Sequence, residues 1–336
     1  MSASTTNEPV ARPLTTPALS PTLGFAAVLG AAALFGMLGP LSRFAYEAGM
    51  EPSAFVAWRA LIGLGGLALY VAWRVRRGAT RLVRPSELSV HARVSLLVAA
   101  LMGFTLNLCM FIAFDRITVA LALLGFYTYP AMVAVVNVAL GRERLDATRT
   151  LALGLALAGM VAVVASQLDP ATGIRFDVIG LALAIGAAVS QTVFVIVSRD
   201  GYRDVPTEQA MSVVLLVTVL GAGSLALVSG AGGTLGYPLT APSVVPLLLF
   251  TGIFAAAIPS LGFLAGIRSI GGTRAGILML FEPVVGVALA AVFLAEGLTL
   301  LQVLGGATIL LAALLVQRGV GSAREATAIA PAPGGP

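Results

Sequence analysis

Long apolar stretches separated by short polar segments fill almost the whole chain. Ten of them hold 16 to 24 residues each, close to the ~20 that a helix needs to cross a bilayer. Strand-like alternation of apolar and polar residues is absent, and backbone amides in lipid must be bonded within their own segment, so the pattern predicts ten transmembrane helices. The predicted spans are Leu23–Phe44, Pro52–Trp73, Ser95–Phe114, Ile117–Leu140, Leu151–Ser166, Val178–Ser198, Ala210–Ser229, Val244–Ile267, Ala275–Ala295 and Leu300–Val316.

The composition agrees with a protein whose solvent is lipid. The chain is 58% hydrophobic and 10% charged, whereas soluble chains carry about 25% charged residues. Only Asp115 and Arg116 separate the third and fourth spans, which predicts a tight helical hairpin. The Pro-rich residues 1–22 and the Ala-, Pro- and Gly-rich residues 318–336 are predicted to be disordered cytoplasmic tails.

The basic residues predict an orientation in the membrane. All 20 are arginine, and placing the amino terminus in the cytoplasm puts 16 of them on that side. Three then lie outside (Arg43, Arg116 and Arg175), and Arg59 lies within a span. This bias predicts a multi-pass protein of the inner or plasma membrane with both termini in the cytoplasm. Topology accounts for the net charge of +5, so no nucleic-acid partner is expected.

The second five spans repeat the first five. We therefore expect one five-helix unit over residues 23–166, a linker over 167–177 and a second unit over 178–317. An odd number of spans per unit makes the two units enter the membrane from opposite sides, which is an inverted repeat typical of secondary transporters. The best matches pair Gly24 with Gly180 and Gly30 with Gly186 at an offset of 156, and Pro130 with Pro283 and Glu143 with Glu296 at an offset of 153.

Two segments, ALLGFYTYPAMVAVVNVALGRERLD and LMLFEPVVGVALAAVFLAEGLT, carry a family resemblance. Each has a mid-span proline followed by a glutamate-containing turn, and together they resemble the EamA group of the drug/metabolite transporter (DMT) superfamily. The turn at Gly141–Leu145 is one residue longer than usual, and the turn at Ala295–Leu298 lacks the arginine.

The resemblance extends from about Leu23 to Val316 and implies an all-α membrane fold of ten helices. It also implies a permease that exports small metabolites, often against a proton gradient. By the same analogy, the fifth and tenth helices are where a homodimer would form. The expected partners are thus a small-molecule substrate, the lipid bilayer and a second copy of the chain.

Glu282 is the clearest candidate for function, because an ionised group in lipid costs about 2.5–3.5 kcal/mol on insertion scales. It lies near the middle of the ninth span, directly before Pro283. One interpretation is a carboxyl that binds a proton or a substrate amine. The other is a carboxyl that satisfies backbone groups freed by Pro283. We expect Glu282→Gln to separate the two.

Arg59, Asn107 and Gln191 are the other polar candidates within spans. Arg59 can hold a substrate carboxylate by a forked hydrogen bond, extend outward to the interface, or bond carbonyls of a neighbouring helix. Asn107 and Gln191 can orient a solute, or they can simply connect helices.

Tyr127 and Tyr129 lie just before Pro130 and would point about 200° apart on a straight helix. Both can line one cavity only if Pro130 breaks the helix; otherwise they are packing residues. Tyr129 is the position equivalent to Glu282 and ranks above Tyr127. Pro130, Pro283 and Pro259 are the predicted helix kinks.

The sequence points away from several other classes. There is no lysine for the phosphate cradle of a P-loop ATPase. With one cysteine (Cys109) and one histidine (His91), no metal centre, disulfide, cofactor or catalytic residue is expected. The prediction is a secondary active transporter, not an enzyme, that exports a small metabolite or amino-acid-like solute by alternating access, with proton coupling left open. The alternatives are a flippase for lipid-linked substrates and a non-transporting channel or sensor.

Overall fold

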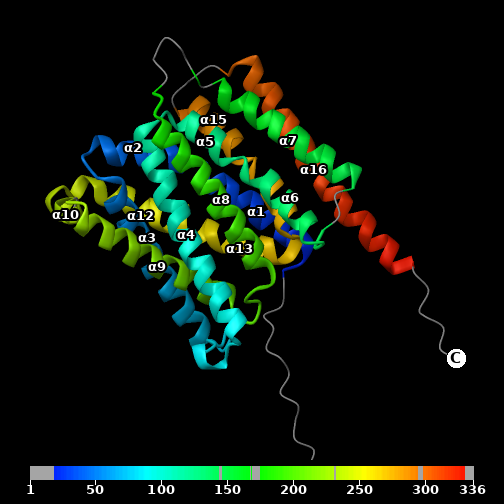
Figure 1. Cartoon of the computed structure of the whole chain (residues 1–336), viewed down its shortest axis with the longest axis horizontal. Helices are drawn as coiled ribbons and strands as arrows, with labels where there is room; N and C mark the ends of the chain where they lie inside the picture. Colours follow the sequence, from blue (N-terminus) through cyan, green and yellow to red (C-terminus); the bar gives the residue numbers. More distant parts are fainter. Residues whose placement is uncertain are drawn as a thin grey trace, which may run out of the picture.

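The computed structural model describes residues 19–143, 146–166, 168, 175–230, 232–293 and 298–329, with only the backbone of 290–293 and 318–329. Within these ranges every element is helical, and ten segments are long and apolar enough to cross a membrane (Figure 1). The first half contains α1 (Pro21–Phe35) with α2 (Leu38–Glu47), α3 (Pro52–Arg76), α4 (Val90–Arg116), α5 (Val119–Phe126) with α6 (Tyr129–Ala139), and α7 (Ala147–Ala165).

The second half repeats this plan. It contains α8 (Val178–Asp200), α9 (Thr207–Val228), α12 (Val245–Gly252) with η3 (Ile253–Ala257) and α13 (Ile258–Ile270), α14 (Gly272–Met279) with α15 (Glu282–Phe293), and α16 (Leu300–Ile329). The short connecting helices are η1 (Pro85–Glu87), α10 (Gly232–Leu235), α11 (Tyr237–Thr240) and η2 (Pro242–Val244).

Polar side chains cap the starts of several helices, so that these helices begin before the apolar stretches of the sequence. The Ser89 hydroxyl accepts from the amide of Ala92 at 3.1 Å, and the Asp146 carboxylate accepts from the amide of Arg149 at 2.7 Å. Such caps satisfy amides that have no partner in the first turn. The third and fifth spans therefore begin at Val90 and Ala147, five and four residues earlier than hydropathy alone predicts.

One predicted tail also differs. The helix α16 continues to Ile329, whereas the composition predicted disorder from residue 318 onward. Proline, which would stop the helix, first occurs at Pro331, and the Ala, Arg and Glu residues before it favour helix. Residues 1–18, most of the 167–177 linker and residues 330–336 lie outside the described residues.

The packing of the helices follows a two-fold relation between the halves. The helix α1 packs on α13, and its counterpart α8 packs on α4, which is the counterpart of α13. A Cβ on Gly24 would meet Ile270 at 3.3 Å, and a Cβ on Gly180 would meet Ile117 at 2.7 Å. Gly24 and Gly180 are the pair matched at an offset of 156, so equivalent glycines make equivalent close approaches. The structure therefore contains an inverted repeat.

The fourth and ninth spans are interrupted at equivalent places. The helix α5 ends at Phe126 and α6 resumes at Tyr129, while α14 ends at Met279 and α15 resumes at Glu282. In each case the second helix has proline at its second position, Pro130 or Pro283, where a missing amide hydrogen costs nothing. The eighth span carries a π-helical turn, η3, immediately before the helix that contains Pro259.

The first span is also interrupted, between α1 and α2, which the sequence analysis did not predict. A Cβ on Gly36 at this break would lie 2.7 Å from the carbonyl oxygen of Glu282. The absence of a side chain lets the break in the first span contact the break in the ninth span. Two irregular backbone segments thus meet at mid-membrane, where they are shielded by protein.

The fifth and tenth spans, α7 and α16, lie side by side along one edge of the bundle (Figure 1). Their closest approach is a glycine pair: a Cβ on Gly159 would meet the Gly305 oxygen at 2.6 Å, and a Cβ on Gly305 would meet the Gly159 oxygen at 2.7 Å. Small residues of this kind let helix backbones approach closely in lipid. The two spans therefore contact each other within one chain, and the homodimer along this edge stays a prediction.

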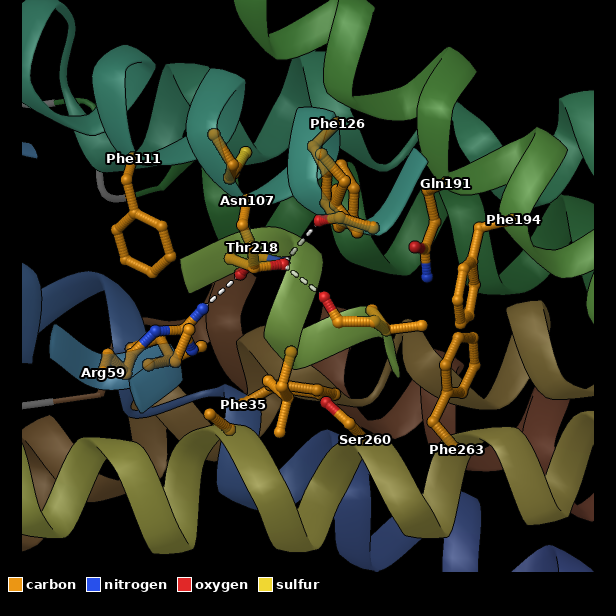
Figure 2. Close-up of a pocket in the computed structure, with 18 of the residues that line it drawn as sticks. Phe35, Arg59, Asn107, Phe111, Phe126, Gln191, Phe194, Thr218, Ser260 and Phe263 are labelled. Atoms are coloured by element: carbon orange, nitrogen blue, oxygen red, sulfur yellow. Dashed lines mark hydrogen bonds between the residues drawn. The ribbon is translucent and has the colours of Figure 1, made fainter. Parts of the chain in front are cut away.

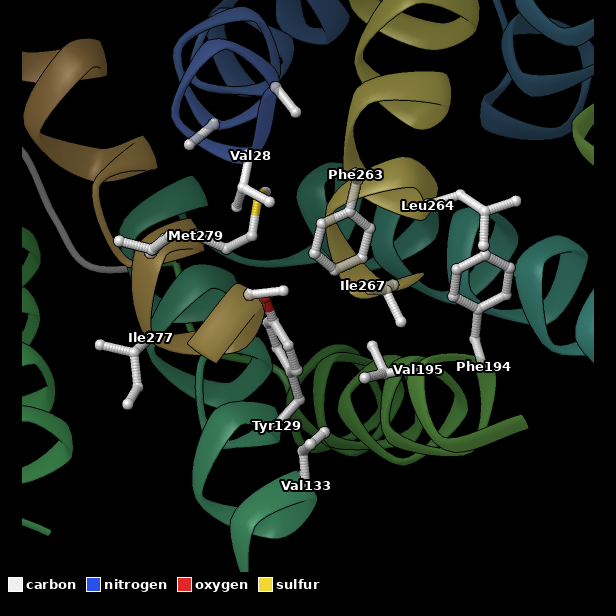
Figure 3. Packing of buried hydrophobic residues seen from close by; sticks show 14 of the residues in the cluster. Val28, Tyr129, Val133, Phe194, Val195, Phe263, Leu264, Ile267, Ile277 and Met279 are labelled. Carbon is white, nitrogen blue, oxygen red and sulfur yellow. The ribbon is translucent and has the colours of Figure 1, made fainter. Parts of the chain in front are cut away.

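Val133, Val195 and Ile267 belong to the buried hydrophobic cluster and form an apolar layer next to the cavity described below (Figure 3). Val133, Val195 and Ile267 are fully buried, and each lies four residues, one helical turn, beyond Tyr129, Gln191 and Phe263 respectively. Because the latter three line the cavity described below, this layer closes the cavity toward the end that carries Glu143 and Arg199.

Candidate functional site

A central cavity of about 130 Å³ lies between the two halves. This is room for several water molecules. Among the described residues, its wall draws on every span except the fifth and the tenth, which pack on each other at the edge of the bundle. The polar groups of the wall come from Arg59, Asn107, Tyr129, Gln191, Thr218, Ser260 and Glu282, and its aromatic rings come from Phe35, Phe111, Phe114, Phe126, Tyr129, Phe194 and Phe263.

Arg59 is held in the cavity wall by its neighbours and does not extend to the interface. Its side chain is 3% exposed, its Nη1 donates to the carbonyl of Ala255 at 3.0 Å, and its Nη2 donates to Oδ1 of Asn107 (Figure 2). The guanidinium lies over the ring of Phe111 at 4.7 Å. Its Nε has no hydrogen-bond partner among the described residues.

These contacts satisfy some of the hydrogen-bond donors of the Arg59 guanidinium but leave its charge without a counter-ion among the described residues. The partners are a carbonyl, an amide and an aromatic ring, and no carboxylate of the described residues lies within ion-pair distance of it. A buried cation without a counter-ion is costly, so such a site is suited to a ligand that brings an anionic group.

Asn107 fixes the direction of Arg59. Its Nδ2 donates to the carbonyl of Gly103 at 2.7 Å, which leaves Oδ1 to accept from Arg59. Asn107 therefore orients the guanidinium in addition to lining the wall.

Glu282 is the first residue of α15 and lines the cavity, half-buried. The amides that follow Pro283 do not need its carboxylate, because Val284 and Val285 both donate to the carbonyl of Phe281, at 3.1 and 3.3 Å. The side chain is thus available to the cavity, and it also lies close to Tyr129 in the wall and to Tyr127 behind the wall. No arginine lies within ion-pair distance of it in the part of the chain described.

The break before Pro130 separates the roles of the two tyrosines. Tyr129 lines the cavity, whereas Tyr127 is fully buried behind the wall. The wall position is taken by Phe126, whose ring lies 5.4 Å from that of Tyr127 and 5.1 Å from that of Tyr129. The expectation that Tyr127 lines the cavity is therefore not met. Its hydroxyl and that of Tyr129 lack a hydrogen-bond partner among the described side chains and backbone.

Gln191 lines the wall opposite the Arg59 end, close to Phe194 (Figure 2). It is 6% exposed, and its Oε1 has no hydrogen-bond partner in the described ranges. A buried amide oxygen without a donor carries a desolvation cost that a ligand donor would remove. Gln191 is therefore a second polar group ready to bind a solute.

Sequence reasoning missed Ser260, Thr218 and the aromatic wall. Thr218 donates its hydroxyl to the carbonyl of Val214 at 2.8 Å, so it contributes little hydrogen bonding to the cavity. Ser260 directly follows Pro259, and a hydroxyl beside a kink is the signal that could have found it. The phenylalanines are spread over five spans and carry no pattern that separates them from ordinary core residues.

Pro130, Pro259 and Pro283 are buried at the irregular segments, and their rings do not line the cavity among the residues described. Cys109 is a free, half-buried thiol. Over the described ranges, no group of three or more His, Cys, Asp or Glu side chains is placed to hold a metal ion.

Comparison with known proteins assigns a class to this architecture. Residues 22–165 and 178–318 each match the profile of the EamA-like transporter family. An uncharacterized transporter of Archaeoglobus fulgidus is 31% identical over 209 residues, which cover 61% of this chain and 70% of that protein. A solved crystal structure superposes with a TM-score of 0.66 at 21% identity, covering 88% of this chain and 96% of its own, and shares the fold.

Proposed function

Because the chain belongs to the EamA-like transporter family of the DMT superfamily and is a multi-pass membrane transporter, we propose that it exports a small amino-acid-like solute by alternating access. The observation that carries the proposal is the central cavity between two inverted halves, with a guanidinium and a carboxyl in its wall, neither of which is ion-paired with a described residue. Inverted repeats around one site supply two exchangeable conformations.

The chemistry of the wall favours a zwitterion with an apolar body. Arg59 is suited to bind a carboxylate, and Glu282 is suited to bind an ammonium group. The phenylalanines between them form an apolar surface that matches an aliphatic or aromatic side chain. Gln191 offers an acceptor for a further donor of the solute.

Glu282 also supports coupling to protons. It is the only carboxyl among the described residues of the wall, and it sits where the ninth span is interrupted. We propose that it carries a proton in one conformation and releases it to bind the solute ammonium in the other. Proton entry then drives solute exit without both occupying the carboxyl at once.

We propose that the protein lies in the inner or plasma membrane with both termini in the cytoplasm. This orientation defines which end of the cavity faces the cytoplasm. The bias of arginines toward one side supports this placement. Solute would then enter the cavity from the end that carries Glu143 and Arg199.

The test uses proteoliposomes screened for efflux of amino acids and related metabolites, with and without an imposed pH gradient. We expect efflux of at least one zwitterion to accelerate when the outside is acid. Glu282→Gln should abolish this acceleration while leaving exchange of the solute across the membrane. If Glu282→Gln retains the full pH dependence, the coupling role is wrong; if no solute moves with either protein, the export proposal is wrong.

A further inference from the structure

A second pocket of about 410 Å³ lies at the end of the bundle beyond the buried apolar layer, away from the central cavity. It is formed by three segments that are distant in the sequence: the α6–α7 connection, the end of α8 and the start of α14. Four guanidinium groups and two carboxylates line it: Arg142, Arg149, Arg199 and Arg274, with Glu143 and Asp146. We refer to it as the arginine pocket.

Both carboxylates of the arginine pocket are engaged. Glu143 accepts a hydrogen bond from Nη1 of Arg199 at 2.6 Å. Asp146 caps α7 by accepting from the amide of Arg149 and lies 3.6 Å from the Nε of the same residue. The positive charge of the pocket is therefore only partly compensated by its own acids.

Arg142 and Arg274 form no ion pair with the described residues; Arg142 donates only to the carbonyl of Ile196. Arg274 is half-buried, and the charges of Arg149, Arg199, Glu143 and Asp146 all act on its guanidinium. The two carboxylates are already engaged with Arg149 and Arg199. Arg274 also lies in the first turn of α14, which contains no acidic residue. A cation there is opposed both by its like-charged neighbours and by the positive end of the helix dipole.

The backbone at this point is shaped to bring α14 close to the ion pair. Gly271, which precedes α14, has a φ of 88°, a conformation that favours glycine. A Cβ there would meet Oε1 of Glu143 at 3.2 Å and Cζ of Arg199 at 3.8 Å. The start of α14 thus lies beside the ion pair of Glu143 and Arg199. The positive end of a helix dipole next to several guanidinium groups favours an anion.

We infer that the arginine pocket binds a phosphate group, supplied either by an anionic phospholipid headgroup or by a soluble phosphate compound. The tetrahedral oxygens of phosphate match forked guanidinium donors, and a phosphate would neutralise the charge that the two carboxylates leave. Membrane topology alone would spread arginines along the cytoplasmic edge. Here they converge on one concavity from three segments. The inference does not depend on the proposed transport activity.

The first experiment measures binding of inorganic phosphate to the full-length protein in an uncharged detergent, by calorimetry and by the shift in melting temperature, with chloride as the reference anion. Arg274→Gln removes the half-buried guanidinium of the pocket that forms no ion pair with the described residues. We expect it to weaken phosphate binding roughly tenfold or more, as loss of a charge-assisted hydrogen bond does. Arg142→Gln, in the exposed loop, tests the same site without altering a helix. Arg76→Gln, an exposed arginine at the same end of the bundle but outside the pocket, is the matched control.

The second experiment places the protein in nanodiscs of phosphatidylcholine with or without phosphatidylglycerol and measures retained phosphatidylglycerol by native mass spectrometry. Retention by the wild type and by Arg76→Gln, but not by Arg274→Gln, identifies the lipid as the source. Binding of inorganic phosphate without retention of phosphatidylglycerol identifies a soluble phosphate. If Arg274→Gln and Arg142→Gln bind both probes as the wild type does, or if Arg76→Gln loses as much, the arginine pocket is not a phosphate site. Because neither readout involves solute efflux, failure here leaves the export proposal untouched.

Discussion

Replacing Arg59 by methionine tests how the cavity recognises its solute. Methionine is similar in length but removes the charge and the donors to Ala255 and Asn107. A hydrogen bond to a charged group contributes about 1.5–3 kcal/mol. If Arg59 binds the carboxylate of the solute, Arg59→Met should weaken binding roughly 10- to 150-fold.

The assay compares two ligands, namely a transported zwitterion found by the efflux screen and its analogue in which an amide replaces the carboxylate. Affinity is measured for the wild type, Arg59→Met, Arg59→Lys and the control Arg76→Met. The loss should appear for the zwitterion and largely vanish for the amide, because only the carboxylate needs the guanidinium. Arg59→Lys keeps the charge without the forked pair of donors, so its affinity for the zwitterion should lie between those of the wild type and Arg59→Met.

Equal losses for both ligands would mean that Arg59 only supports the wall. That result would refute the recognition role, because the orphaned Asn107 and Ala255 oxygens would then explain the whole effect. Melting temperatures of the ligand-free variants measure that structural contribution separately.

Three further outcomes follow from the structure. Gly159→Leu should lower the melting temperature, because the leucine side chain would collide with the Gly305 carbonyl, 2.6 Å from the new Cβ. Solute affinity should change little, because this contact is remote from the cavity. An equal loss of affinity would contradict the separation of the α7–α16 pair from the site. Phe126→Ala opens the wall beside Tyr129 and should weaken binding of solutes with large apolar side chains more than binding of small solutes such as glycine, as measured by competition. Equal weakening for both kinds of solute would place Phe126 outside the binding surface. The hydrogen bond from Arg116 lowers the pKa of Asp177, so the stability that this ion pair adds to the fold should be complete above about pH 5 and lost as the pH falls through the lowered pKa. The difference in melting temperature between wild type and Asp177→Asn should therefore shrink below about pH 4. A difference that stays constant with pH would exclude the ion pair as its cause.

The ten spans and the inverted repeat were predictable because hydropathy and the odd number of helices per half follow directly from the order of residues. The breaks before Pro130 and Pro283 were predictable for a similar reason, since proline removes a backbone donor wherever the fold places it. The break at Gly36 was not. It depends on contact with the Glu282 carbonyl from a span far along the chain, and a lone glycine does not reveal that contact.

The residues of the cavity could likewise be predicted only in part from the sequence. Arg59, Asn107, Gln191, Tyr129 and Glu282 stood out because polar groups in apolar spans require an explanation, and all five line one cavity. Tyr127 met the same criterion but lies behind the wall, because the exact turn at which the helix breaks decides which ring faces inward. Phe126 fills that position, and no local signal marks one phenylalanine among many apolar neighbours.

We propose that the two inverted halves expose one shared cavity to each side of the membrane in turn. This proposal is tested most directly by a single cysteine at Gln191 in a Cys109→Ser background, since Cys109 is the only native cysteine. Membrane-impermeant thiol reagents are applied from either side of oriented vesicles, with and without the transported solute. The account predicts modification from both sides, each slowed by solute, with no leak of small ions. Modification from one side only, or from both sides together with ion leak, would contradict alternating access through this cavity.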